Sequence, residues 1–305
     1  MTERKWGLLG VLALLWGTSF LWSKVALAEL PPLPLVLGRF GLAAVALLVA
    51  ARVSGQPIPT APRVWGGFFV LGALKSFIPF GLIAWGQVQL TSGLASILNA
   101  TPPLFTALVA HALGDERLTA NRAAGVAIGF AGVCVLIGPG ALGGPGLHTL
   151  AELAILGAAV SYAFAGTYGR RLRALPPVVA VTGMMTTAAL LALPIALAVD
   201  RPWTLTVGAR TWAALLALAL PTTALGFVIY FHLLASAGAT NVMLVTLLIP
   251  VIALLLGAAL LGEPVTSTAL VGLVLIAGGL VVIDGRFLRR GRVVVGSPRG
   301  RPTEG

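Results

Sequence analysis

Charge is the scarcest property of this sequence. Only 10% of its 305 residues are Asp, Glu, Lys or Arg, and 58% are hydrophobic. Soluble domains carry about 25% charged residues, so this composition excludes a water-soluble globular chain. The apolar runs therefore decide the class of protein, and they indicate a membrane protein.

Cysteines and catalytic motifs are also missing. The one cysteine, Cys134, lies inside an apolar run, which excludes a disulfide framework and a cysteine-based metal or redox motif. The sequence contains no HExxH, no GxSxG and no cluster of acids. We therefore expect no enzyme activity, no catalytic residues, no metal ligands and no cofactor.

Acidic residues are absent from the middle of every apolar segment. Those that adjoin the segments all fall at terminal or loop positions: Glu29, Asp115, Glu116, Glu152, Asp200, Glu263 and Asp284. A carboxylate proton relay, which is common in pumps, consequently has no evident position in this chain.

Ten apolar segments are each long enough to cross a bilayer core of roughly 30 Å. We expect them at 7–27, 33–53, 65–87, 92–113, 121–138, 150–169, 177–199, 211–235, 239–261 and 268–284. We expect the first segment to be retained as a helix. Its run from Trp6 to Trp22 is longer than a typical signal-peptide core, and Lys24 interrupts the region before the cleavage-like residues 26–28.

Residues 95–119 and 242–266 are two copies of one pattern. An offset of 147 residues aligns Pro103 with Pro250, Glu116 with Glu263, Thr119 with Thr266, Gly125 with Gly272 and Gly132 with Gly279. Transporter sites commonly form at repeat interfaces beside interrupted helices, so this duplication predicts a transporter scaffold.

Each copy contains five segments, and five is an odd number, so the second copy enters the membrane from the opposite side. The sequence thus predicts an all-α membrane protein with ten transmembrane helices in two inverted-topology five-helix repeats. We divide the chain into a first repeat at 1–138, an outer Gly/Pro linker at 139–149, a second repeat at 150–284 and a basic cytoplasmic tail at 285–305.

The basic residues are distributed unevenly between the two sides. Fifteen of the 20 Lys and Arg fall in the loops and tails of one side, and only Arg201 and Arg210 fall in those of the other. The positive-inside rule places both termini in the cytoplasm. The net charge of +11 is then a topological signal and a contact for anionic membrane lipids, and we expect no nucleic-acid partner.

Several motifs together resemble those of a known family. They are Trp16-Gly17 with Lys24 in the first segment, Pro103 with the turn at 113–118, and Pro250 with the turn at 261–263. On these residues the chain resembles, over about 7–284, a ten-helix member of the drug/metabolite transporter superfamily with two EamA-type repeats. Tyr162 and Arg170 stand where that family often has Trp and Lys. The resemblance implies a central cavity walled by the first, third, sixth and eighth helices.

Lys75 lies near the middle of the third segment, roughly 15 Å from its inner end. Ionisable groups at such a depth are functional candidates by default. Lys75 either contacts an anionic substrate group, or it is deprotonated or snorkels to bond backbone carbonyls. Arg39 is nearer a segment end, where a structural tie between helices or to lipid headgroups is the simpler role. Buried cations without buried acids favour a substrate with a carboxylate.

Asn99 and Thr101 precede Pro102 and Pro103, which lack two backbone donors and so free carbonyls in the fourth helix. Either these groups meet a polar substrate, or the two side chains satisfy the freed carbonyls internally.

Aromatic residues complete the candidate site. Trp16, Trp85, Tyr162 and Tyr230 lie on helices that the resemblance places around the cavity. We take them, together with Lys75, Asn99 and Thr101, as candidate substrate-binding residues. Ordinary helix packing is the alternative for each aromatic residue.

Glu116 and Glu263 occupy equivalent turns of the two copies. Each stands just before a helix start marked by Thr119 or Thr266, where a negative charge favours the positive end of the helix dipole. We interpret both as structural caps.

These features together predict a secondary transporter in the bacterial inner membrane that exports or exchanges small polar metabolites, chiefly amino acids or related carboxylates, by alternating access. We expect a small-molecule substrate and a functional monomer. Xenobiotic efflux is the alternative within transport, and an intramembrane lipid-handling enzyme is the alternative from another class. The substrate, direction and coupling ion are left open.

The distribution of basic residues makes the topology testable. Cysteines introduced at Ala141 and Arg201 should react with an impermeant reagent added outside, and those at Gln56 and Arg173 should not. Labelling of position 173 from outside would overturn the arrangement.

Overall fold

The computed structural model describes residues 2–114, 118–138, 146–169, 175–242 and 244–285. Its helices are α1 (Glu3–Ala26), α2 (Pro32–Val53), α3 (Pro62–Leu71), η1 (Gly72–Phe77), α4 (Ile78–Gln89), α5 (Ser92–Leu98), α6 (Pro102–Ala112), α7 (Ala120–Ile137), α8 (Leu147–Tyr168), α9 (Pro177–Val199), η4 (Pro202–Thr204), α10 (Ala209–Ala217), η5 (Leu218–Leu225), α11 (Gly226–Ala237), α12 (Ala239–Val242), α13 (Leu244–Leu261) and α14 (Ser267–Asp284). Within the described ranges they form ten apolar spans of membrane-crossing length, as the sequence predicts.

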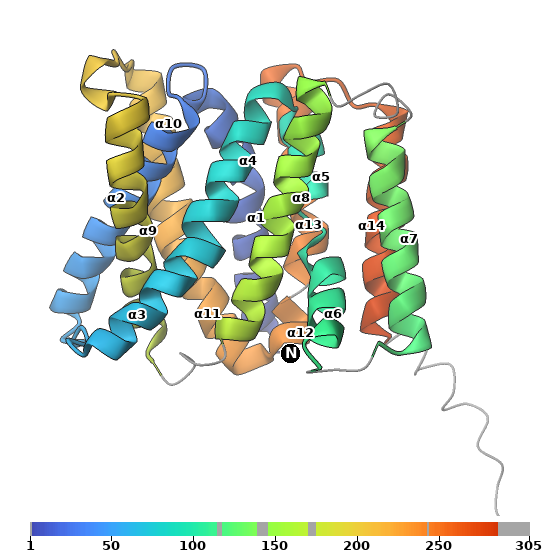
Figure 1. The fold of residues 1–305 in the computed structure, drawn as a ribbon, viewed down its shortest axis with the longest axis horizontal. Coiled ribbons are helices and arrows are strands. Elements are labelled where there is room, and N and C mark those ends of the chain that lie inside the picture. Colours follow the sequence, from blue (N-terminus) through green and yellow to red (C-terminus); the bar gives the residue numbers. More distant parts are fainter. Residues whose placement is uncertain (1, 115–117, 139–145, 170–174, 243, 286–305) are drawn as a thin grey trace, which may run out of the picture.

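The spans stand side by side in one bundle (Figure 1). We call the end of the bundle where α1 begins the N-side and the opposite end the far side. Because α7 ends and α8 begins at the far side, the second set of five spans crosses in the opposite sense to the first. The observed fold is therefore the all-helical, two-repeat arrangement that the sequence predicts.

The ends of many helices follow from local sequence. Proline occupies the first turn of α2, α3, α6 and α9, where its missing N–H costs nothing. Threonine caps α5, α7 and α14, and in each case its hydroxyl accepts a bond from a backbone N–H of the first turn: Thr91, Thr119 and Thr266.

Glu263 caps a different helix from the one expected. Its carboxylate accepts bonds from the Ser92 backbone N–H at 2.8 and 3.0 Å and from the Ser92 hydroxyl at 3.1 Å. It therefore caps α5 of the first repeat, not α14, whose cap is the Thr266 hydroxyl. The structural role is as expected, but the helix is not. The equivalent Glu116 lies outside the described residues.

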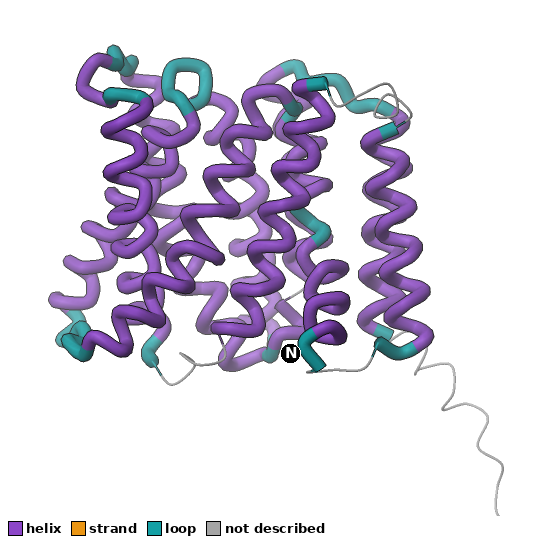
Figure 2. The backbone as a smooth tube through the Cα atoms, viewed as in Figure 1, coloured by secondary structure: helices purple, strands orange, loops and turns teal. Residues whose placement is uncertain are grey.

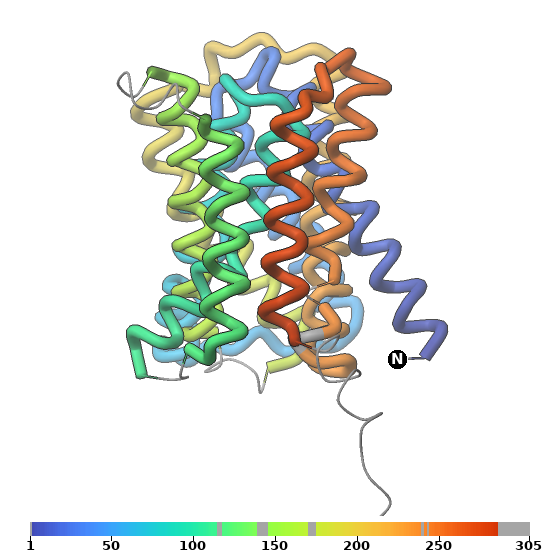
Figure 3. Tube along the Cα trace, turned by 90° about the vertical axis from the view of Figure 1, so that its right-hand side faces the viewer, coloured from blue at the N-terminus to red at the C-terminus, as the bar shows by residue number. Residues whose placement is uncertain are grey.

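Helices α7 and α14 form a closely packed pair that the repeat symmetry explains (Figure 3). A Cβ atom on Gly125 would lie 2.6 Å from the Gly279 carbonyl oxygen, and one on Gly132 would lie 3.0 Å from that of Gly272. Each glycine of α7 thus faces the repeat partner of the other, as a two-fold axis between inverted copies requires. Small residues let two membrane helices approach this closely.

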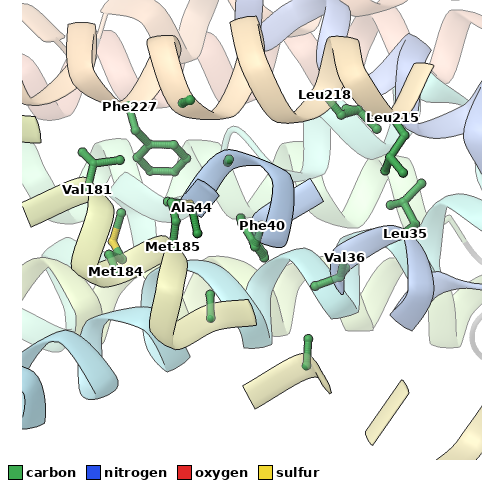
Figure 4. Packing of buried hydrophobic residues seen from close by; sticks show 14 of the residues in the cluster. Leu35, Val36, Phe40, Ala44, Val181, Met184, Met185, Leu215, Leu218 and Phe227 are labelled. Carbon is green, nitrogen blue, oxygen red and sulfur yellow. The ribbon is translucent and has the colours of Figure 1, made fainter. Parts of the chain in front are cut away.

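The largest buried cluster surrounds α2, on the flank of the bundle opposite α7 and α14 (Figure 4). Leu35, Val36 and Phe40 of α2 belong to this cluster together with Met184 and Met185 of α9 and with residues of α10, η5 and α11. This cluster holds α2 and α9, which belong to different repeats, in one body beside the cavity described below.

Two spans contain π-helical segments at matching positions. η1 interrupts the third span and η5 the eighth, and the 147-residue offset carries Gly72 onto Ala219 and Phe77 onto Ala224, both inside η5. A π-helical turn upsets the regular i→i+4 pairing and is often found at functional sites. Lys75 lies in η1, so the local backbone is irregular where the deepest cation stands.

The Glu263 cap yields a stability prediction. Glu263→Gln removes the charge at the start of α5, and we expect the free energy of unfolding to fall by about 1–2 kcal/mol. The melting temperature of the purified protein measures this. Glu3→Gln is the control, because Glu3 is exposed and its side chain makes no hydrogen bond among the described residues. Equal melting temperatures for Glu263→Gln and the unmodified protein would contradict the cap.

Candidate functional site

A cavity of about 1060 Å³ lies between the two repeats. Its wall takes residues from α1, α2, η1, α4, the break between α5 and α6, α8, α9, α11 and α13. Sites for small ligands are concave and mostly apolar with a few placed polar groups, and this cavity has that composition.

The cavity opens at the N-side. Its lining extends to Arg122, Gly169, Gly238 and Asp284, all at N-side ends of their helices, and includes no residue of the far-side loops. Access from one end only is what one state of an alternating-access protein requires.

The far side is closed by polar contacts of α1 with α4. Lys24 Nζ donates to the carbonyl oxygens of Gln87 at 2.7 Å and Leu90 at 2.8 Å, and Gln87 Nε2 donates to the Phe20 carbonyl at 3.1 Å. The half-buried Lys24 side chain thus binds carbonyls at the C-terminal end of α4, a favourable position for a cation.

Lys75 reaches the cavity from η1. Its ammonium nitrogen lies 4.7 Å from the ring centre of Tyr230 and 6.0 Å from that of Tyr162, within cation–π range. Among the described residues no carboxylate forms an ion pair with it. Two aromatic faces therefore hold Lys75 beside the cavity while its charge lacks an anionic partner.

Trp16, Tyr162 and Tyr230 belong to one aromatic wall. The Trp16 ring lies 5.3 Å from Tyr230 and 5.4 Å from Phe227, and Phe80 stands edge-on to Tyr162 at 6.4 Å. Sequence reasoning missed Phe80 and Phe227. Their spacing was the available signal, because Phe80 lies five residues after Lys75 and Phe227 three residues before Tyr230.

Arg39 is a structural tie that also faces the cavity. Its side chain is 3% exposed, and Nε donates to the Thr223 hydroxyl at 2.7 Å. The guanidinium lies 4.4 Å from the Phe80 ring centre. The expected tie between helices is thus present, from α2 to η5, and it brings a second positive charge to the cavity wall.

The fourth span is broken between α5 and α6, at mid-height in the bundle (Figure 2). Asn99 lies in this break and lines the cavity, and its side-chain Oδ1 has no hydrogen-bond partner among the described residues. Thr101 is fully buried, and its hydroxyl donates to the Leu98 carbonyl at 2.7 Å. The sequence left open whether these two side chains meet a substrate or satisfy freed carbonyls. Thr101 satisfies a freed carbonyl, whereas Asn99 lies at the cavity.

Trp85 stands apart from the other candidates. Its side chain is 42% exposed on α4, and it does not line the cavity. The structure brings together Trp16, Lys75, Asn99, Tyr162 and Tyr230, and leaves out Trp85 and Thr101.

One acid differs from its expected place. Glu152, assigned from sequence to a segment end, is 1% exposed on the second turn of α8, and no described residue hydrogen-bonds either of its carboxylate oxygens. His148 Nδ1 lies 3.6 Å from its Oε1. Glu152 does not line the cavity. Among the described residues no group of three or more His, Cys, Asp or Glu side chains is placed to hold a metal.

Ten membrane spans around a central cavity define a multi-pass membrane protein of the transporter class. The chain belongs to the EamA-like transporter family, which matches it twice, over residues 4–138 and 149–284. It is accordingly a transporter and not an enzyme.

Curated relatives span nearly the whole chain. A probable amino-acid metabolite efflux pump of Salmonella typhimurium is 32% identical over 92% of this chain and 95% of its own length. A probable terminal-alkyne amino-acid exporter of Streptantibioticus cattleyicolor is 30% identical over 91% and 92%. A crystal structure at 22% identity superposes with a TM-score of 0.68 over 96% of this chain and 99% of that chain, which supports the fold alone.

Two neighbouring threonines test the Arg39 tie. Thr223→Val leaves the buried Arg39 Nε without its acceptor, and we expect a loss of about 1–3 kcal/mol in the free energy of unfolding. Thr222→Val is the matched control, because the Thr222 hydroxyl bonds only the Leu218 carbonyl of its own helix. Thermal unfolding of both variants measures the difference. Equal destabilisation by the two variants would show that the hydrogen bond from Arg39 to Thr223 does not stabilise the fold.

Proposed function

We propose that this transporter exports or exchanges amino acids or related small carboxylates by alternating access. The observation that carries the proposal is Lys75, a cation beside the cavity that lacks an anionic partner among the described residues. Arg39 adds a second cation to the same wall. A substrate carboxylate supplies the missing negative charge, and the cost of desolvating Lys75 favours such a ligand.

The aromatic wall supports the rest of the substrate. Trp16, Phe227 and Tyr230 form a continuous surface against which a small apolar side chain can pack. Lipophilic cations, the usual cargo of xenobiotic efflux, are disfavoured by Lys75 and Arg39. The relatives named as a probable amino-acid metabolite efflux pump and a probable terminal-alkyne amino-acid exporter agree with this preference.

The direction of access is the next part of the proposal. With both termini in the cytoplasm, the N-side opening faces inward, so the structure corresponds to the state that loads an export substrate. Opening the far side requires the contacts of Lys24 with α4 to break. In the outward-open state, water or other carbonyls would accept the hydrogen bonds that Lys24 now donates to Gln87 and Leu90. The two states then have similar numbers of hydrogen bonds, so their free energies are close enough for interconversion. We further propose that it works as a monomer in the inner membrane.

Counterflow in proteoliposomes tests this function. Vesicles are loaded with one unlabelled amino acid, and uptake of the same amino acid in labelled form is measured. Each of the twenty common amino acids is tried in turn, and we expect at least one to accumulate. Accumulation by protein-containing vesicles and not by empty ones supports the proposal. Failure with every amino acid and with their desamino carboxylates would overturn it.

Lys75→Gln tests the role of the cation. Losing a desolvated charge-assisted bond should weaken carboxylate binding by roughly 10- to 150-fold, while the amide of the same ligand should bind both proteins equally. Lys75→Arg keeps the charge but changes its geometry, and should give an intermediate loss. Direct titration measures these affinities. Lys5→Gln is the control, because Lys5 bonds the Ser236 carbonyl outside the cavity lining. Unchanged carboxylate affinity in Lys75→Gln would remove Lys75 from the site.

A further inference from the structure

The break between α5 and α6 is rich in hydrogen-bond acceptors that lack donors. Pro102 and Pro103 have no N–H, so the carbonyls four residues earlier, those of Leu98 and Asn99, lose their helical donors. Leu98 O is bonded by both the N–H and the hydroxyl of Thr101. Among the described residues, no backbone N–H reaches the carbonyls of Asn99 or Ala100, because Leu104 N bonds Thr101 O instead.

The Asn99 side chain adds a third acceptor. Its Oδ1 is buried and has no hydrogen-bond partner in the described ranges of the chain, although the residue lines the cavity. A buried acceptor left without a donor destabilises the site, and a ligand N–H removes that cost. The terminal torsion of an asparagine is soft, so the amide can turn its oxygen toward a ligand in the cavity.

Electrostatics give this patch of acceptors a preference. The break lies between the C-terminus of α5, whose carbonyls favour a positive group, and the N-terminus of α6, where Pro102 and Pro103 replace two of the N–H donors that would favour a negative one. Interrupted membrane helices offer such carbonyls to cations. The patch therefore presents partial negative charge to the same cavity in which Lys75 presents a positive charge.

We propose that the break at Asn99 and Ala100 binds the α-ammonium group of the substrate and makes the transporter selective for α-amino acids over plain carboxylates. This inference rests on the proposed function, since it assigns the second pole of the same ligand. Lys75 and the break then recognise the two charges of a zwitterion, and Asn99 is the specificity-determining residue.

The role of the ammonium group is tested first on the unmodified protein, with ligands that differ only at that group. The protein in nanodiscs is titrated with the twenty common L-amino acids, and for each that binds, with its desamino carboxylate and its N,N,N-trimethyl derivative. The desamino compound lacks the charge, and the trimethyl compound keeps the charge but has no N–H to donate. We expect both to bind about 10- to 100-fold more weakly than the parent amino acid. Equal affinity for the amino acid and its desamino compound would overturn the proposal.

Variants at Asn99 then locate the recognition. Asn99→Leu should weaken the affinity for the amino acid by about 10- to 100-fold and leave the affinity for its desamino carboxylate unchanged. Asn99→Asp should retain amino-acid binding. Thr106→Val is the control, because Thr106 lines the same cavity but its hydroxyl already donates to the Pro102 carbonyl. An equal effect of Asn99→Leu on both ligands would overturn the assignment.

The remaining outcomes are also decisive. Titrations are repeated with choline in place of sodium. If amino-acid binding requires sodium and Asn99→Leu abolishes that requirement, the break is a sodium site and the ammonium assignment is wrong. If desamino carboxylates bind but no amino acid does, this inference fails while carboxylate transport stands. If neither class binds, both proposals fail.

Discussion

The structure depends on one constraint: inside a membrane every backbone polar group needs a partner from the protein itself. The π-helical segments η1 and η5 disturb regular pairing, and each is met by a side chain from the opposite repeat. Ser161 of α8 donates to the Leu74 carbonyl in η1 at 2.7 Å, and Trp16 of α1 donates to the Thr222 carbonyl in η5 at 3.1 Å. Irregular backbone at the cavity thus holds the two inverted halves together.

The repeats agree in scaffold and differ at the site. Pro103 and Pro250 are equivalent, but Pro102 aligns with Ile249, so the first copy lacks two successive donors and the second lacks one. The fourth span accordingly breaks into α5 and α6, whereas α13 continues through Pro250. In the part of the chain that the structure describes, the symmetric scaffold is therefore interrupted in the fourth span and continuous in α13, and the cation Lys75 belongs to the same repeat as the interruption.

Much of this architecture follows from the sequence alone. Ten apolar runs, the 147-residue repeat and the odd number of spans per copy determine the helices and their inverted order, because a membrane leaves few other ways to bury 58% hydrophobic residues. Residue type and depth were enough to single out Lys75 and Asn99, because a cation or an amide far from water is costly wherever it points.

The tertiary structure decided which partner each group meets. Thr101 and Asn99 are two residues apart, yet one turns to its own backbone and the other to the cavity. Trp85 resembles Trp16 in the sequence, but it lies on the outer face of its helix. Glu263 caps a helix of the other repeat, and Lys24 binds inside the protein. These outcomes depend on helix rotation and on contacts between residues far apart in the chain, and a one-dimensional pattern contains neither.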